Sequence, residues 1–263
     1  MLIDRLATAS ERETKIETSG FEFGSAIPKH WAANNPVITS FFNAVSSVIP
    51  EGEKFFIHSI RYYEKSITDP ELLDAVKLFI HQEDCHSQQH HAMNDWLSST
   101  GYPSLNIEDG LRKNLRLLQS HSSPDTQLAG TVAMEHVSTI LSETLLNNPE
   151  LSIRFHPEIS RFFKWHSKEE LEHKSVAYDV YQTTNPNYWH RVSKLIFVSL
   201  ILLPAVAYIQ LKFLLSEKQL FNVKAWSKAH WYFWVSPGYF RKMMPGYFSY
   251  YRNNFHPSDR DLK

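Results

Sequence analysis

Apolar residues recur along most of the chain at the spacing of a helix, three or four positions apart, and long stretches keep this rhythm. The pattern predicts four long helices, over residues 37–67, 70–98, 125–148 and 157–183. Turn signals separate them, at Thr68-Asp69-Pro70, at Ser123-Pro124-Asp125 and between Asn147 and Pro157. No Asn-Gly or Asp-Gly pair links two alternating stretches, as a hairpin of strands would require. We therefore expect an all-α protein.

Composition divides the chain into three parts. Residues 1–35 are polar and charged, and we expect them to form a loosely ordered N-terminal arm. Residues 36–185 hold the four predicted helices and form a helical bundle. Residues 186–263 form a helical appendage that is rich in apolar and aromatic side chains.

Four glutamates lie on the apolar stripes of the predicted helices. At about 100° per residue, Glu53, Glu83, Glu135 and Glu170 each point the same way as their helix's apolar residues. Two of them are followed by histidine three positions on, at His86 and His173, on the same stripe. The same geometry turns other candidates away from the bundle interior; these are Glu51, Glu143, Glu172 and Cys85.

The glutamates are also expected to lie at matching depths in the bundle. Glu53 and Glu83 are equally distant from residue 68, so an antiparallel hairpin that turns there brings them level. Glu135 and Glu170 are likewise centred on the Asn-Pro-rich connection near residue 152. Between Glu83 and Glu135 the chain is long enough for a crossover along the whole bundle.

Position, rather than number, makes these residues informative. With 18 Glu and 14 His in the chain, about one Glu-x-x-His pair arises by chance, and there are two. Buried carboxylates and imidazoles need partners, because desolvating an unpaired carboxylate is costly. The candidate partners are metal ions or, as the alternative, a network of side chains without metal.

The order Glu53, Glu83-x-x-His86, Glu135, Glu170-x-x-His173 resembles the ferritin-like di-iron carboxylate proteins over residues 40–180. Three segments are closer still to a bacterial family of the ferritin-like superfamily that is called predicted metal-dependent hydrolases; they are residues 50–56, 79–86 and 165–174. This resemblance implies a ferritin-like four-helix bundle with a helical C-terminal appendage.

His166 adds a third histidine, four residues before Glu170 and on the same helix face. The resulting His-x-x-x-Glu-x-x-His resembles the non-haem di-iron arylamine N-oxygenases, although a capping or supporting role is the alternative. His90 is aligned with Glu83 but about 10 Å further along the axis, too far for easy ligation. Asp84, Glu169 and Glu172 are candidates to hold the imidazoles. The expected metal ligands are Glu53, Glu83, His86, Glu135, His166, Glu170 and His173.

Carboxylates and imidazoles suit a pair of iron ions, with manganese or zinc as alternatives, and no thiolate cluster is present. The first hypothesis is an oxidase or oxygenase that uses O2 and an electron donor on a small organic substrate. Small side chains beside Glu135 would leave room for that substrate, at Thr131, Ser138, Thr139 and Ser142. The alternative is a hydrolase that uses a metal-activated water.

Composition excludes some partners and suggests a compartment. A net charge of −1 in 263 residues offers no basic surface for nucleic acid. Cys85 is the single cysteine, and the first residues lack the apolar stretch of a secretory signal, so we expect a cytoplasmic protein.

The appendage leaves two alternatives open. Residues 195–211 are an apolar run barely long enough for a membrane helix, and aromatic and basic residues follow as far as 251. This part of the chain could attach the protein to the inner face of the membrane. It could equally pack on the bundle as a lid over the site. A homodimer is a further expectation that the sequence does not decide.

Overall fold

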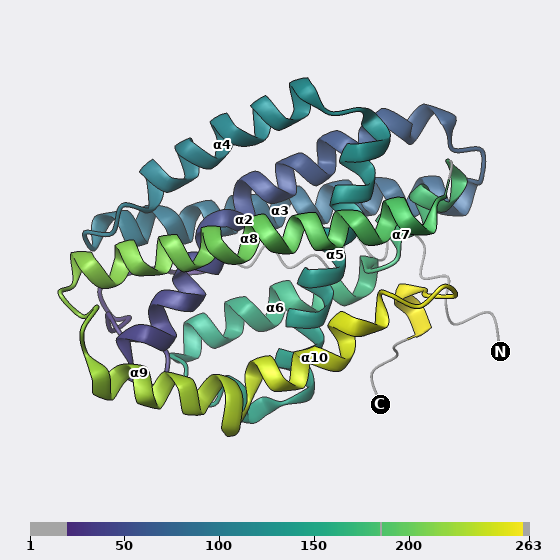
Figure 1. The fold of residues 1–263 in the computed structure, drawn as a ribbon. Coiled ribbons are helices and arrows are strands. Elements are labelled where there is room, and N and C mark those ends of the chain that lie inside the picture. The colour runs from purple at the N-terminus through teal and green to yellow at the C-terminus, as the bar shows by residue number, and fades with distance from the viewer. Residues whose placement is uncertain (1–19, 185, 260–263) are drawn as a thin grey trace.

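The computed structural model describes residues 20–184 and 186–259, and in this part of the chain all the long elements are helices (Figure 1). Four antiparallel segments form a bundle, with the fourth divided in two. The bundle helices are α2 (Pro36–Tyr63), α3 (Pro70–Ser99), α5 (Pro124–Asn147), α6 (Pro157–His173) and α7 (Val176–Thr183). Helix α4 (Ser104–His121) is the crossover, and α8 (Tyr188–Ser216), α9 (Val223–His230), η4 (Trp231–Val235) and α10 (Tyr239–Ser249) follow the bundle. The all-α prediction is confirmed.

Each long bundle segment begins as the turn signals predict. Proline occupies the first position of α2, α3, α5 and α6, where its missing N–H is not needed. Side chains before three of these helices accept backbone N–H bonds. Asn35 accepts from Val37 and Ile38, Asp69 from Glu71, and Ser123 from Thr126.

The predicted helix 157–183 is interrupted in the structure. Helix α6 ends at His173, residues 174–175 form a turn, and α7 begins at Val176. The apolar stripe continues across the turn, because Ala177 and Tyr181 are buried like the residues before it. No proline or glycine marks the turn, so the sequence pattern carries no signal for it.

Part of the predicted loose arm is packed against the bundle. Trp31 is buried and donates from Nε1 to Asn43 Oδ1 of α2 at 3.0 Å. Ala32 forms an isolated antiparallel bridge with Phe155, just before α6. The arm prediction therefore fails for residues 20–35, whose apolar side chains find partners far along the chain. Residues 1–19 lie outside the described part.

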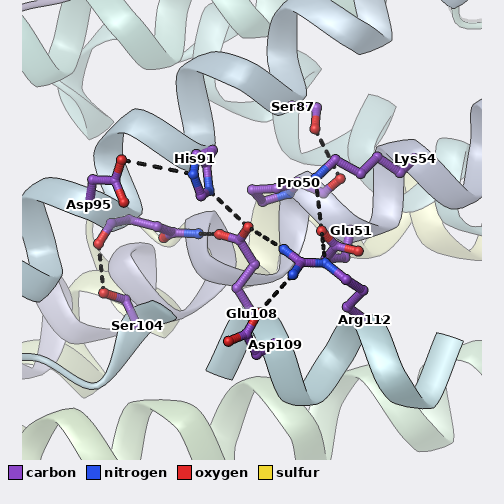
Figure 2. A network of polar contacts seen from close by, with 11 residues as sticks. Pro50, Glu51, Lys54, Ser87, His91, Asp95, Ser104, Glu108, Asp109 and Arg112 are labelled. Carbon is purple, nitrogen blue, oxygen red and sulfur yellow. Dashed lines mark hydrogen bonds and ion pairs between the residues drawn. The ribbon is translucent and has the colours of Figure 1, made fainter. Parts of the chain in front are cut away.

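A buried polar network fixes the crossover helix α4 to α2 and α3 (Figure 2). Arg112 of α4 donates to Glu51 Oε1 of α2 at 3.0 Å and to Glu108 Oε1 at 3.3 Å. Glu108 also accepts from His91 Nδ1 and Asn94 Nδ2 of α3, at 2.8 and 2.9 Å. Glu51 thus serves α4, and it faces away from Glu53 as the helical geometry predicts.

The elements after the bundle cover one of its sides, and we call α8, α9, η4 and α10 the C-terminal layer. Helix α8 packs along α2 and α5, α9 packs on α2, and α10 packs on α5 (Figure 1). In the described part of the chain, α8 is the one helix long and apolar enough to cross a bilayer. Its placement against two bundle helices gives it a packing partner along one face.

Candidate metal centre

The bundle core is apolar toward both ends and polar in the middle. One cluster of buried apolar residues surrounds Phe42, Met93 and Phe162, and the other surrounds Phe56 and Phe79. Between them all four segments place titratable side chains at one level, as the equal hairpin arms predict. This polar layer is the candidate site.

The structure brings all seven predicted ligands into this layer. Each is almost completely buried, and the most exposed of them, His166, has 6% of its surface accessible. Helix α2 supplies one residue, α3 two, α5 one and α6 three. They are Glu53; Glu83 and His86; Glu135; and His166, Glu170 and His173.

Four of these side chains form a first ligand group. Glu53, His86, His166 and Glu170 have donor atoms that all lie within 4.8 Å of one another. His166 Nε2 is 3.4 Å and His86 Nδ1 is 3.7 Å from Glu170 Oε1. The two imidazoles also approach Glu53 Oε1, at 3.9 and 3.8 Å. Two carboxylates and two imidazoles at these separations could hold one divalent ion.

A second ligand group overlaps the first. It contains Glu83, His86, Glu170 and His173, again within 4.8 Å of one another. His173 Nε2 is 3.3 Å from Glu83 Oε1, and its Nδ1 is 3.7 Å from Glu135 Oε2. Glu170 and His86 belong to both groups. The two carboxylate oxygens of Glu170 could bridge two ions, whereas His86 has one ring nitrogen, Nδ1, left for a single ion because Nε2 is paired with Glu169. Glu135 lies beside the second group through His173 rather than within it.

Burial disfavours the charged form of every group in the cluster. It raises the pKa of Glu53, Glu83 and Glu135 well above the ordinary value, and neighbouring carboxylates raise it further. Burial raises the pKa of Glu170 to about 8, against a hydrogen bond from Ser138 that lowers it. The pKa values of His86, His166 and His173 are lowered well below normal, first by burial and then by neighbouring imidazoles. Bound cations would reverse the shifts of the glutamates by favouring the carboxylate form, and they would favour the neutral imidazole form of the histidines further.

Many donor atoms in the cluster lack a hydrogen-bond partner among the described residues. Both carboxylate oxygens of Glu53, Glu83 and Glu135 are buried in this state, as are both ring nitrogens of His173. Buried polar atoms are nearly always paired, so such a concentration calls for a ligand. The side-chain network considered as an alternative would have paired these atoms. The cluster therefore fits a metal site.

Glu169 holds one of the imidazoles in place. Its Oε2 lies 3.0 Å from His86 Nε2, so the ring donates there and turns Nδ1 toward Glu53 and Glu170. Carboxylates commonly orient metal-binding histidines in this way. The other two acidic candidates serve the helix surface instead. Gln82 donates to Glu172 at 3.1 Å, and Gln88 donates to Asp84 at 2.8 Å.

His90 lies next to the cluster but outside both ligand groups. Its ring centroid is 4.8 Å from that of His166, and its Nδ1 is 2.7 Å from Ser46 Oγ. This position agrees with the expectation from helix geometry that His90 is too far along the axis.

A cavity of about 50 Å³ adjoins the cluster, between α2, α5, α6 and α10. At about 10 to 15 Å³ for each water-sized group, it has room for a few such groups. Its lining is mostly apolar, with His166, Ser138, Ser142 and Ser167 as the polar members; the others are Phe41, Phe42, Val45, Ile49, Leu141, Leu145, Phe163 and Tyr239.

The sequence predicts room for a substrate beside four small side chains near Glu135, and the cavity includes two of them. Ser138 and Ser142 line the cavity, but Thr131 is directed to Ser59, with 2.7 Å between the hydroxyl oxygens, and Thr139 is not in the lining. Tyr239 reaches the cavity from the C-terminal layer, which agrees with the alternative that the appendage packs on the bundle over the site. No local pattern singles out Tyr239 for this contact.

Comparison with curated proteins and with solved structures gives no match. The sequence does match a family described as predicted metal-dependent hydrolase, over residues 17–261, which include every residue of the cluster. The buried histidine and glutamate donors agree with metal dependence. The chain therefore belongs to the predicted metal-dependent hydrolase family.

Proposed function

We propose that this protein is a hydrolase that works with two divalent metal ions held in the bundle. The observation that carries the proposal is the set of buried donor atoms without partners, arranged as two overlapping groups that share His86 and Glu170. The family description supports hydrolysis as the reaction. Iron, manganese and zinc all suit carboxylate and imidazole ligands.

Metal ions bound in this position would supply an acidified water and would polarise the bond to be cleaved. The chain's own groups prepare the site for this. Glu169 fixes the His86 ring, and Ser138 donates to Glu170, so two donors are oriented before an ion arrives. The buried surroundings exclude bulk water, which strengthens the attraction between a cation and these carboxylates.

The cavity indicates the kind of substrate group that reaches the site. His166 belongs to the first ligand group and also lines the cavity. Because the remaining walls are mainly aromatic and aliphatic, a small apolar group beside the scissile bond would fit better than a charged one. We therefore propose a small, largely apolar ester or related acyl compound as the substrate class.

A second candidate is oxidation of a small organic substrate with O2 and an electron donor. The donor set favours it, because four carboxylates and three imidazoles in a helical bundle suit iron. The sequence pattern favours oxidation over hydrolysis, whereas the family description favours hydrolysis. Iron as the metal and oxidation as the reaction both stay predictions.

One experiment separates the two candidates. The full chain is stripped with chelator and reloaded without oxygen, with Fe²⁺, Mn²⁺ or Zn²⁺. Hydrolysis of 4-nitrophenyl acetate and butyrate is then measured without oxygen, and oxygen consumption is measured separately with a reductant. We expect chelator-sensitive hydrolysis that Glu170→Ala and His86→Ala abolish and Glu172→Ala retains. Oxygen consumption by the iron form, without hydrolysis in any metal form, would favour the second candidate.

A further inference from the structure

Helix α8 is apolar on both of its faces. Toward the bundle it buries Leu195, Ile209 and Phe213. Toward the outside it exposes a continuous row of large apolar side chains, and Leu200 has 70% of its surface accessible. The row consists of Ile196, Phe197, Leu200, Ile201, Leu203 and Tyr208. A helix packed on a soluble bundle normally exposes polar residues, so this outer face is expected to have a partner.

Polar contacts hold α8 flat against the protein. Gln210 Nε2 donates to the backbone oxygen of Val37 at 3.0 Å, and Ser199 Oγ lies 2.8 Å from the Tyr247 hydroxyl. Near the start of α8, buried Arg191 donates to the backbone oxygen of Arg252 at 2.9 Å. These contacts spread over the helix and fix it along the bundle. The partner must therefore cover the outer face in place, and α8 does not need to cross a bilayer.

The same layer exposes several tryptophans. Trp226, Trp231 and Trp234 are 37%, 58% and 46% accessible, and Phe248 of α10 is 61% accessible. Tryptophan is enriched where a protein meets the boundary between lipid headgroups and acyl chains, because its ring is apolar and its N–H is polar. Exposed indoles beside an apolar helix face are typical of a surface that lies in this boundary.

Charge distinguishes a lipid surface from a second copy of the chain. Residues 188–249 contain eight Lys and Arg and one acid, Glu217, for a net charge of +7, whereas the whole chain carries −1. Arg191 is buried and Lys242 pairs with Glu150, so six basic residues of this segment remain for a partner. Glu217 itself is directed to His30, with 2.6 Å between the two side chains. Anionic lipids attract such a basic segment. Two copies of it face to face would repel each other.

We propose that the outer face of the C-terminal layer docks on an anionic lipid bilayer. The apolar row of α8 and the exposed tryptophans enter the headgroup region, and the surrounding lysines and arginines bind lipid phosphates. The protein then lies on the membrane surface, with the bundle on the water side.

Flotation of the full chain with vesicles tests this proposal. One set of vesicles is phosphatidylcholine alone, and the other contains phosphatidylglycerol at about a third of the lipid. We expect the chain to float with the anionic vesicles, and to do so less as salt is raised, since salt screens the attraction. Equal recovery in the pellet with both vesicle types would overturn the proposal.

Two pairs of variants separate the apolar and charged contributions. Leu200→Asp should lower vesicle binding at least about tenfold, because a carboxylate is costly at the depth of the apolar row. Its matched control is Leu117→Asp on α4, where Leu117 is 61% accessible, and this variant should bind normally. Lys224→Glu should lower binding about fivefold or more. Lys77→Glu on α3 is the matched charge control.

The oligomeric state in lipid-free solution completes the test. We expect light scattering to show no change of mass between the native chain and Leu200→Asp. If the native chain were a dimer that Leu200→Asp converts to a monomer, and vesicles did not bind, the outer face would belong to a second copy and the proposal would be wrong. If Leu200→Asp failed to fold, Lys224→Glu against Lys77→Glu would still decide.

Discussion

Replacement of Glu170 by glutamine should have opposite effects on stability with and without metal. Without metal, the buried carboxyl lowers the stability of the folded protein, since burial and the nearby Glu169 disfavour its charged form. With metal, the same carboxylate belongs to both ligand groups. Glu170→Gln should therefore stabilise the metal-free protein and destabilise the metal-loaded one. A residue with a purely structural role would not change sign in this way.

The size of the metal-free effect follows from the pKa of Glu170, which burial raises from 4.5 to about 8. Below pH 4.5 the carboxyl is protonated in both the folded and the unfolded chain, so the variant and the native protein should differ little. As pH rises toward 8, folding must hold the proton in place, which at about pH 7.5 costs at most about 4 kcal/mol. Because glutamine still buries a polar amide, we expect a gain of about 2 kcal/mol.

Bound metal reverses the sign of the effect that Glu170→Gln has on stability. A ligand shared by two ions affects both, and a loss of about 100-fold in affinity for each removes about 5 kcal/mol of metal-dependent stabilisation in total. The net effect on the loaded protein is then a loss of about 3 kcal/mol.

Urea unfolding at about pH 7.5, with chelator and with saturating Mn²⁺, measures both free energies. Glu172→Gln is the matched control, because Glu172 lies two positions on, is exposed, and should change neither value. The reasoning would be refuted if Glu170→Gln lowered the stability of the metal-free protein and left the metal-dependent increment unchanged.

Three further predictions concern protons, the crossover helix and the cavity. Metal affinity should fall as pH falls below 8, approaching about tenfold per pH unit for the single proton of Glu170, in metal titrations at fixed pH values. Arg112→Ala leaves two buried carboxylates short of a partner, so unfolding should become easier by about 1 to 3 kcal/mol, and amide exchange in α4 should speed up. Ser142→Phe fills the cavity, so kcat/KM should fall at least about tenfold while metal content, measured by plasma spectrometry, stays at the native level.

The levels of the site residues could be predicted because helical geometry is regular. A fixed rise and turn per residue place Glu53 opposite Glu83 once the turn at Asp69 and Pro70 is recognised, and the structure places both in the polar layer. The same geometry directs Glu51 away, toward Arg112 of α4. The resemblance to the predicted metal-dependent hydrolase family is confirmed as well.

Contacts between distant parts of the chain could not be predicted in this way. Trp31 is buried against α2 although it lies outside any predicted helix, and Tyr239 reaches the cavity from the C-terminal layer. These positions depend on which surfaces meet after folding, and no local periodicity records that. The turn after His173 could likewise not be predicted, because it contains no proline or glycine. The roles of the seven residues as metal ligands stay a prediction.

Metal content tests the central claim most directly. The full chain is loaded with Fe²⁺ or Mn²⁺, passed through a desalting column and analysed by inductively coupled plasma spectrometry beside Glu170→Ala, His86→Ala and Glu172→Ala. We expect about two ions per native chain, a large loss in the first two variants, and native content in Glu172→Ala. Native metal content in both Glu170→Ala and His86→Ala would contradict the account, since it would place any metal elsewhere in the protein.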